Sequence, residues 1–365
     1  MASFDEVLKD CTKLGTKIPT SEYLENGKYP IIDQGQNDIA GYYDSDNGLF
    51  KDVPAIVFGD HTRVVKYVDK PCFLGADGVK LLCPLDKDIN CKYLFYQLSC
   101  ADIPNTGYNR HFKWVKALDF KIPSSDEQNH VVEVLDKVTE LIFLRKQQLA
   151  KLDELVKARF VEMFGDAKLN PNNLPCCSLS EYIVFLTSGS RGWSQYFTDS
   201  GEYFITIKNV KNCKITLQDV QCVTPPDNAE AKRTRVQEND LLISITADLG
   251  RTGIVTKKIA EHGAYINQHL TCIRLKQDKL NPLYVAYYME SDAGKEQFIA
   301  KNQSAVKAGL NFNAINSLKL MVPPLALQNQ FAAFVERVDQ QKQTVQQSLE
   351  KLELMKKALM QEYFG

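Results

Sequence analysis

The sequence lacks the features that mark several classes of protein. No stretch approaches the roughly 18 consecutive apolar residues of a membrane-spanning helix, and residues 1–13 carry acidic side chains without the apolar segment of a signal peptide. Lysine plus arginine number 44 against 45 for aspartate plus glutamate, a formal net charge of −1, which argues against a protein that coats nucleic acid by bulk charge. We therefore expect a cytoplasmic globular protein without a membrane segment.

Motifs that hold metals, phosphates or cofactors are also missing. The ten cysteines form no C-x-x-C pair and the five histidines no H-x-x-x-H spacing, so we expect reduced, mostly buried cysteines and no zinc site. The chain contains no P-loop, dinucleotide-binding, nucleophile-elbow or H-E-x-x-H motif. Segment 224–227 has the paired prolines of an amino-methyltransferase motif but lacks its flanking residues, and we interpret it as a loop. The sequence predicts no cofactor, no metal and no catalytic residue in this chain.

An ungapped internal repeat is the strongest feature that is present. Residues 112–165 match residues 312–365 at an offset of 200, and 13 positions are identical in the last 46 residues of each copy. The identical pairs include Pro123 and Pro323, Gln128 and Gln328, Leu149 and Leu349, Lys151 and Lys351, Leu152 and Leu352, and the Phe-Gly endings at 164–165 and 364–365. Further upstream, residues 27–31 echo 201–205, and residues 54–58 echo 240–244. The chain is therefore predicted to be a duplicated unit in which variable and similar segments alternate.

Both similar segments predict long helices. Their apolar residues alternate at spacings of four and three, Ser125 and Gln128 have capping-box spacing after Pro123, and Gly165 can end the first helix. At about 1.5 Å per residue each helix is on the order of 57 Å long, so we expect the two to pair with each other; the alternative is two unrelated amphipathic helices, each packed on its own domain. The predicted pairing residues are Val131, Leu135, Val138, Ile142, Leu149 and Leu152 in the first helix and Val335, Val338, Val345, Leu349 and Leu352 in the second.

Four cations in these seams do not determine the direction of pairing. They are Arg145 and Arg159 in the first helix and Lys342 and Lys356 in the second. Parallel stacking would place Arg145 opposite Val345, and antiparallel stacking would place it opposite Leu349. Both arrangements avoid facing cations, so the seam alone is compatible with either.

The regions between the helices predict an α+β fold. Short β-rich runs at 55–58, 63–68, 203–207, 240–245 and 270–275 are separated by Gly, Asn and Asp turns, and helical patterns lie near 91–100 and 282–299. We predict four parts, namely a globule at 1–122, a helix at 123–165, a second globule at 166–322 and a second helix at 323–365. Loops on a rigid scaffold are where recognition residues concentrate.

Basic residues interleaved with aromatics and amides are the candidates for binding, because such side chains hold phosphates and read base edges. The candidates in the first globule are Arg63, Lys66, Asn109, Arg110, His111, Lys113 and Lys116. Those in the second are Ser190, Arg191, Trp193, Arg233, Arg235, Arg251, Asn267 and Gln268. For each cluster the alternative is a solvated basic loop or a buried aromatic beside a charge, and Phe112 and Trp114 also fit a core role.

The whole layout resembles the specificity subunit of type I restriction-modification systems, in which two target-recognition domains alternate with two similar helices. The matching features are the Pro-to-Gln helix starts at 123–128 and 323–328, the Phe-Gly helix ends, and segments 201–205 and 240–244 of the second domain. The chain departs from the family in having Leu327-Gln328 where the first copy has the usual Glu127-Gln128, and it is short for the family.

The resemblance implies a function without bond chemistry in this chain. It implies that the globules are target-recognition domains that read a bipartite, asymmetric double-stranded DNA sequence, and that the helices form an antiparallel coiled coil that docks partners. Those partners are two modification subunits, which use S-adenosylmethionine to methylate adenine, and restriction subunits that use ATP and magnesium. Two other classes are weighed: a coiled-coil scaffolding protein without DNA readout, and a specificity half fused to a methylase, for which the chain has no cofactor motif.

Overall fold

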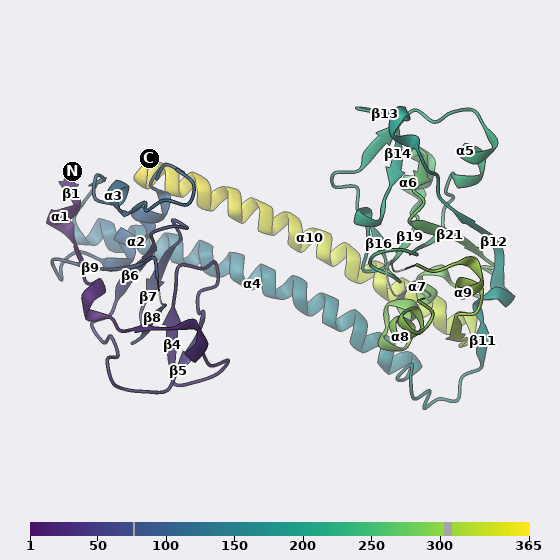
Figure 1. Cartoon of the computed structure of the whole chain (residues 1–365), viewed down its shortest axis with the longest axis horizontal. Coiled ribbons are helices and arrows are strands. Elements are labelled where there is room, and N and C mark those ends of the chain that lie inside the picture. The colour runs from purple at the N-terminus through teal and green to yellow at the C-terminus, as the bar shows by residue number, and fades with distance from the viewer. Residues whose placement is uncertain (76, 303–308) are drawn as a thin grey trace. The chain divides into compact units, whose positions relative to one another are not determined.

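Two compact units make up the chain in this computed structural model, which describes residues 1–75, 77–302 and 309–365 (Figure 1). Unit 1 consists of Met1–Gln148 together with Val345–Gly365, and unit 2 consists of Leu149–Thr344. Helices α4 (Ser125–Phe164) and α10 (Leu325–Phe364) each contribute one part to unit 1 and another to unit 2. Each unit therefore combines one predicted globule with part of both long helices, whereas the predicted four-part division assigns each helix to a part of its own.

In its described residues, unit 1 contains three β-sheets and three short α-helices besides its parts of α4 and α10. The elements are β1 (Ala2–Ser3), α1 (Phe4–Val7), β2 (Leu8–Asp10), β3 (Lys17–Ile18), β4 (Tyr29–Ile32), β5 (Gly41–Tyr43), β6 (Ala55–Gly59), β7 (Val65–Val68), β8 (Phe73–Gly75), β9 (Val79–Pro84), α2 (Cys91–Cys100), α3 (Phe112–Val115) and β10 (Asp119–Phe120). The sheet orders are β2-β9-β6-β7, β3-β8-β4-β5 and β1-β10. The first sheet is antiparallel, whereas β8 runs parallel to both β3 and β4.

Unit 2 repeats most of this arrangement. Its elements are β11 (Cys176–Ser178), β12 (Ile183–Ser188), β13 (Phe197–Thr198), β14 (Glu202–Ile205), β15 (Val210–Lys211), β16 (Lys214–Ile215), β17 (Gln221–Val223), α5 (Ala229–Thr234), β18 (Leu241–Ser244), β19 (Thr252–Ile254), α6 (Lys257–His262), β20 (Ala264–Ile266), β21 (Leu270–Leu275), α7 (Pro282–Glu290), α8 (Asp292–Ala300), α9 (Phe312–Asn316) and β22 (Lys319–Met321). The sheet orders are β12-β21-β18-β19, β13-β17-β14-β20, β15-β16 and β11-β22. Thus β6 and β18, whose sequences echo each other, occupy the same place in equivalent sheets.

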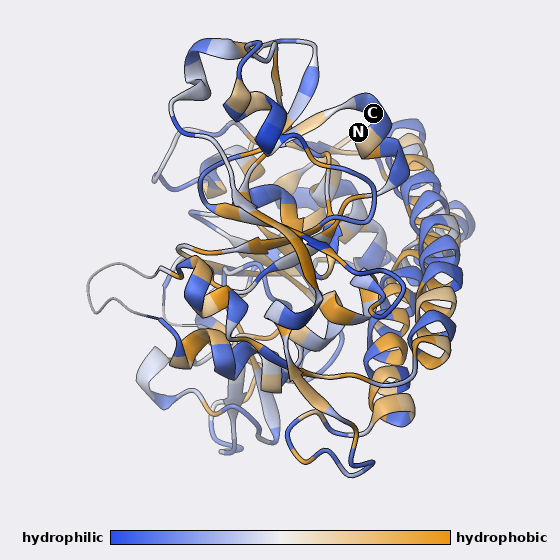
Figure 2. Cartoon of the chain, turned by 90° about the vertical axis from the view of Figure 1, so that its right-hand side faces the viewer, coloured by the Kyte–Doolittle hydropathy of each residue, from blue (hydrophilic) through white to orange (hydrophobic). Residues whose placement is uncertain are grey.

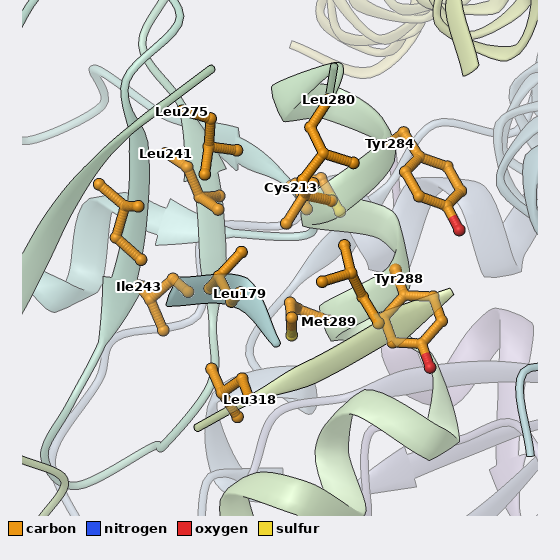
Figure 3. Close-up of a cluster of buried hydrophobic side chains, with 14 of the residues drawn as sticks. Leu179, Cys213, Leu241, Ile243, Leu275, Leu280, Tyr284, Tyr288, Met289 and Leu318 are labelled. Carbon is orange, nitrogen blue, oxygen red and sulfur yellow. The ribbon is translucent and has the colours of Figure 1, made fainter. Parts of the chain in front are cut away.

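The central strand of each large sheet separates two cores. In β6, Ile56 and Phe58 belong to a cluster with α2 and the start of α4, while Ala55 and Val57 belong to a second cluster on the opposite face. Strand β18 does the same, because Leu241 and Ile243 pack with α7, as Figure 3 shows, and Leu242 packs on the other side. Successive side chains of a strand point to opposite faces. A strand buried on both faces has to be apolar throughout, which explains the uninterrupted runs at 55–58 and 241–243.

Within each unit the parts of α4 and α10 run in opposite directions. In unit 1 the Arg145 Nε donates to the Ser348 hydroxyl at 3.2 Å, while Val131 and Leu135, earlier in α4, pack in one hydrophobic cluster with Leu359 and Phe364, later in α10. In unit 2 Lys342 pairs with Asp153, and the guanidinium of Arg159 lies 5.7 Å from the ring centroid of Phe334. Lower numbers on one helix meet higher numbers on the other in both units, so the pairing is antiparallel and the predicted pair of long helices is confirmed.

The pairing residues are covered by the globules as well as by the partner helix. In unit 1 Val131 and Leu135 pack in one cluster with α2 and with Leu359 and Phe364 of α10. In unit 2 Phe160 and Phe164 contact Phe331 at ring-centroid distances of 5.4 and 5.6 Å. Val138, Val335, Val338, Val345 and Leu349 are buried, and Ile142, Leu149, Leu152 and Leu352 are half-buried. Hydrophobic and hydrophilic residues alternate along both helices in Figure 2, as an amphipathic pattern requires.

The predicted capping box of α4 is wrong by one residue. The Ser124 hydroxyl donates to the Glu127 carboxylate at 2.8 Å and the Ser124 N–H at 3.1 Å, so the box is Ser124 with Glu127. Gln128 is instead buried, and it accepts from the backbone N–H of Asn90 at 2.9 Å while donating to the Pro123 carbonyl at 2.9 Å. Gln128 therefore joins the start of α4 to the start of α2.

Gln328 makes the same connection in unit 2. It accepts from the Asn281 N–H at 2.8 Å and donates to the Pro323 carbonyl at 2.7 Å, and Asn281 caps α7. The identical glutamines of the repeat thus hold equivalent joints, each between a long helix and the helix that packs under it.

The cysteines match the expectation of reduced, mostly buried thiols. All ten are unpaired, six are buried and Cys176 alone is exposed. Burial raises the pKa of Cys72 and of Cys91 to about 12. In the described residues no helix is both long enough and apolar enough to cross a membrane.

Candidate nucleic-acid interface

Three loops of unit 1 meet at one end of its sheets. They are residues 33–40 after β4, residues 59–64 after β6 and residues 103–111 before α3, and we call them the first loop face. The Gln34 side chain accepts from the His61 N–H at 3.2 Å, and the Gln34 carbonyl accepts from the Thr62 hydroxyl at 2.6 Å. The His61 ring stacks on that of Tyr108 with centroids 4.7 Å apart and planes 8° apart. The three loops therefore form one continuous surface.

His111 anchors this face and does not belong to its surface. Its side chain is fully buried, its Nδ1 lies 2.9 Å from the Asp60 carbonyl oxygen, and its N–H donates to the same oxygen at 2.8 Å. The Asp60 carboxylate accepts from the Phe112 N–H at 2.7 Å. His111 and Asp60 thus join the loop after β6 to the start of α3.

Arg63 and Lys66 are likewise engaged inside the unit. The Lys66 ammonium is 5% exposed, forms an ion pair with Asp33 at 3.3 Å and donates to the Asn37 carbonyl at 2.5 Å. Arg63 is half-buried and donates to the Ile103 carbonyl at 3.0 Å. Lys66 thus joins β7 to the loop after β4, and Arg63 joins the loop after β6 to the loop before α3.

The remaining candidates of unit 1 are exposed. Asn109 and Arg110 lie on the loop before α3, and Lys113 and Lys116 project from α3 and its end. The Lys113 ammonium lies 5.2 Å from the ring centroid of Trp114, which is 37% exposed. These side chains provide one amide group and three cations around α3.

In unit 2 the loops after β12, β18 and β20 meet at the corresponding end of the sheets. The Ser190 N–H donates to the Ile266 carbonyl at 2.9 Å, and the Gln268 N–H donates to the Ser190 carbonyl at 3.0 Å. The Thr246 hydroxyl lies 2.7 Å from Nδ1 of His269, whose Nε2 lies 3.3 Å from the Gln268 amide. We call the surface formed by 188–192, 245–251 and 267–269 the second loop face.

Two predicted contacts of unit 2 are buried. The Ser190 hydroxyl is 2% exposed and lies 3.1 Å from the Thr234 hydroxyl. Trp193 is 3% exposed, and its ring stacks on Phe204 with centroids 5.6 Å apart. Both hold the β12 loop against β14 and β20, so in this structure they position the loop.

The arginines of unit 2 surround the loops and most of them have partners. Arg233 donates to the Ser188 carbonyl at 2.9 Å, Arg235 pairs with Glu202 at 3.1 Å, and Arg251 pairs with Asp248. Arg191 is exposed on the loop that Ser190 anchors, while Asn267 and Gln268 are half-buried. Arg233, Arg235 and Arg251 would have to exchange these partners to bind a phosphate, whereas Arg191 projects from the second loop face.

Sequence reasoning missed Gln34, His61 and Tyr108. Their clearest signal was the polar stretch 33–38, which falls between two strands and contains two glutamines and one asparagine. In residues 1–75, 77–302 and 309–365, no three His, Cys, Asp or Glu side chains form a group that could hold a metal ion.

The comparisons with known proteins agree with this duplicated arrangement. The family described as the type I restriction modification DNA specificity domain matches residues 5–154 and 191–354. The specificity subunit of the type I restriction enzyme EcoR124I/EcoR124II from Escherichia coli is 20% identical over 355 residues, which cover 88% of this chain and 82% of the relative. A putative type I restriction enzyme MjaX specificity subunit from Methanocaldococcus jannaschii is 23% identical over 381 residues, covering 95% and 86%.

Solved structures share the fold. The crystal structure of a type I restriction-modification S subunit from M. genitalium matches with a TM-score of 0.61 at 16% identity, covering 100% of this chain and 95% of the other. A structure described as the basis of complex assembly and conformational transition of the type I R-M system matches with a TM-score of 0.54 at 16% identity, covering 98% and 97%.

The family match includes most of each globule and of the long helix that follows it, and it therefore covers both halves of the duplication. This chain belongs to the type I restriction-modification DNA specificity family, whose members are the non-catalytic recognition subunits of such systems.

Proposed function

We propose that this specificity subunit reads a bipartite, asymmetric DNA sequence, with the first globule contacting one half-site and the second globule the other. The observation that carries the proposal is the duplicated scaffold with two different loop faces. The sheets β2-β9-β6-β7 and β12-β21-β18-β19 have the same order, yet the loops at their ends differ in length and sequence. An asymmetric two-part target requires two recognition domains, and these can share a scaffold if their contact surfaces differ.

The remaining candidates, which are exposed or half-buried, divide into one set for each half-site. The first set is Asn109, Arg110, Lys113 and Lys116, and the second is Arg191, Arg233, Arg235, Arg251, Asn267 and Gln268. Arginine can bind guanine through two hydrogen bonds and amides can bind adenine in the same way, while lysine holds phosphates. The net charge of −1 fits a reader whose partners supply many of the phosphate contacts.

The long helices are proposed to carry two copies of the modification subunit. The repeat supports this because one exposed face of each helix has three residues that are identical in the two copies and one large apolar residue, Leu or Met. That face is Lys151, Leu155, Ala158 and Glu162 in α4 and Lys351, Met355, Ala358 and Glu362 in α10. Leu155 and Met355 are 46% and 51% exposed. Equivalent apolar contacts on two equivalent faces suit two copies of one partner.

The catalytic components are proposed to lie in the partners. The modification subunits would bring S-adenosylmethionine, and restriction subunits would bring ATP-driven translocation with magnesium. The role of this chain is to place those activities at a chosen DNA sequence.

The proposal is tested by exchanging one globule. Residues 1–122 are replaced by the equivalent segment of a family member with a known target, and the methylated adenines are mapped in cells that express the chimera with both modification subunits. We expect one half of the methylated sequence to change and the other half to stay. An unchanged target, or a change in both halves, would contradict one reader per half-site, and methylation independent of sequence would favour a scaffold without DNA readout.

A further inference from the structure

Tyr108 is an aromatic residue held out into solvent on the first loop face. Its side chain is 88% exposed, the highest value among the exposed large hydrophobic residues in the described part of the chain. Its ring stacks on that of His61, with 4.7 Å between centroids and 8° between planes. The stack covers one side of the tyrosine ring and leaves the rest in water.

The loop that carries Tyr108 is fixed on both sides of the ring. Upstream, Arg63 holds the Ile103 carbonyl at 3.0 Å, and the Thr106 N–H donates to Nε2 of the buried His111 at 3.3 Å. Immediately before the tyrosine, Gly107 has a φ of +77°, and the Asn109 N–H donates to the Gly107 carbonyl at 2.8 Å. A left-handed backbone favours glycine at this position, so the tight turn that projects Tyr108 is built into the loop.

His61 is fixed from the opposite side. Its backbone N–H donates to the Gln34 side chain at 3.2 Å, and Thr62, the next residue, holds the Gln34 carbonyl at 2.6 Å. In the part of the chain that the structure describes, Nδ1 of His61 is buried without a hydrogen-bond partner. The imidazole is therefore held by its backbone and by the stack, which makes it a rigid support for the tyrosine.

The surroundings of the ring suit a nucleobase edge. Asn109 and Arg110 follow on the same loop, and Gln36 and Asn37 are exposed on the neighbouring loop after β4. These side chains offer hydrogen bonds to base edges and a cation for phosphate. The tyrosine ring adds an apolar surface, which these side chains lack. The apolar group that a base edge presents in the major groove is the methyl group of thymine.

We propose that Tyr108, supported by His61, is a specificity-determining residue of the first globule and contacts a thymine methyl group in the half-site that this globule reads. The inference rests on the proposed function, because it requires the first loop face to meet DNA. Tyr108 makes the contact, and His61 is a positioning residue. A ring that is already held in place loses little conformational entropy on binding. The free energy of its contact is therefore available to distinguish one base from another.

The test uses the complex of the full chain with its modification subunits and a duplex that contains the methylated target. Each thymine of both half-sites is replaced singly by uracil, which removes only the methyl group, and equilibrium affinity is measured for the wild type, Tyr108→Ala, Tyr108→Phe and His61→Ala. Leu85→Ala is the matched control, because Leu85 is 48% exposed in the same unit and lies outside both the first loop face and the long helices.

We expect one uracil substitution in the first half-site to weaken wild-type binding about five- to tenfold. Tyr108→Ala should lower affinity for the intact target by a similar factor and abolish the response to that uracil. Tyr108→Phe should keep the response because the ring is retained, His61→Ala should reduce it, and Leu85→Ala should leave it unchanged.

Three results would overturn the inference. Tyr108→Ala could respond to every uracil as the wild type does, it could weaken all sequences equally, or its altered position could lie in the second half-site. In each of these cases the proposed function stands if the wild type still prefers its target over unrelated duplexes, and it fails if that preference is absent. If Tyr108→Ala does not fold, the wild-type complex is irradiated on duplexes that carry 5-iodouracil in place of single thymines. Crosslinks to Tyr108 from one position of the first half-site support the inference, and crosslinks that do not map to Tyr108 overturn it.

Discussion

The two globules share a scaffold and differ at its margins. Strands β8-β4-β5 of unit 1 and β20-β14-β17 of unit 2 have the same order and directions, but the fourth strand is added at opposite ends, as β3 beside β8 and as β13 beside β17. Unit 2 also has the small sheet β15-β16 and helices α5 and α6 between its strands. The added strands β3 and β13 have only two residues each, so the two units keep the order of three strands and differ at the margin of the sheet.

The starts of the long helices differ in the same instructive way. The bonds of Gln128 and Gln328 to α2 and α7 are present in both copies, whereas the cap formed by Ser124 and Glu127 is replaced by Pro324 and Leu327 in the second. A bond between two elements cannot be replaced by changing one residue, but a local cap can be exchanged for proline at the helix start. The two copies therefore share the glutamine bonds between helices and differ in the caps at the starts of the long helices.

The largest difference between the units is expected at one position of the repeat. Phe331 is fully buried among the rings of Phe160, Phe164 and Tyr287, while its equivalent Val131 is smaller and 7% exposed. Phe331→Ala should destabilise unit 2 by about 3–5 kcal/mol, and Val131→Ala should destabilise unit 1 by about 1–2 kcal/mol. Hydrogen exchange measured peptide by peptide separates the units, and equal losses would show that the two cores depend on this position alike.

The two glutamine joints should instead behave alike. Removing either side chain leaves a backbone N–H and a carbonyl of a buried joint without their partner, so Gln128→Ala and Gln328→Ala should each cost about 1–3 kcal/mol in their own unit. Faster exchange of the Asn90 and Asn281 amides is the readout. A response in only one of the two variants would break the equivalence of the joints.

Recognition should separate cleanly between the loop faces. Arg110→Ala should alter preference in one half-site and Arg191→Ala in the other, by about 1–3 kcal/mol at a single base pair if the arginine binds a base. An arginine that binds phosphate would lower affinity for all sequences without changing preference. Competition between singly substituted duplexes measures both effects. If both variants altered preference in the same half-site, the division of recognition between the two loop faces would be contradicted.

The smallest effect concerns pH and only the first helix start. Hydrogen bonds from the Ser124 hydroxyl and N–H lower the pKa of Glu127 below its ordinary 4.5. A lowered pKa means that the carboxylate stabilises the first turn above the ordinary value and that this contribution is lost as pH falls through the lowered pKa. The protection factors of the amides in the first turn of α4, corrected for the intrinsic pH dependence of exchange, should therefore fall on acidification, and Glu127→Gln should lose this response. The first turn of α10, which has Leu327 there, serves as the internal control.

Sequence patterns found the elements that repeat or are buried throughout. The alternating spacing predicted α4 and α10, and apolar runs predicted β6, β18 and β21, because burial on two faces leaves a run that is easy to read. Residues 282–299, a single helical stretch in the sequence, are two helices because Ser291 ends α7 and caps α8. The direction of helix pairing required the structure, since the seam permits both.

The candidate site was predicted less well because residue type does not reveal burial. Lys66, His111, Ser190 and Trp193 have the chemistry of DNA contacts but hold loops from inside. Their partners, such as Asp33 for Lys66 and Asp60 for His111, are 33 and 51 residues away in sequence. Contacts of that range follow from the sheet order, which local patterns do not specify. Conversely, Tyr108 has no basic neighbour on its N-terminal side, so the pattern of basic and aromatic residues does not indicate it. Its position over His61 follows only from the fold.

The composition of unit 1 has a consequence for biosynthesis. Its core includes Leu359, Met360 and Phe364 of α10, packed with α2 and the start of α4. The roughly 200 residues of unit 2 are translated in between, which takes about 10–40 s at about 5–20 residues per second. On the ribosome, the apolar face of the first globule that α10 covers therefore stays exposed while unit 2 is translated and its core forms. The part of the chain made first is the last to finish folding, and nascent chains arrested before residue 345 should be the ones that chaperones bind.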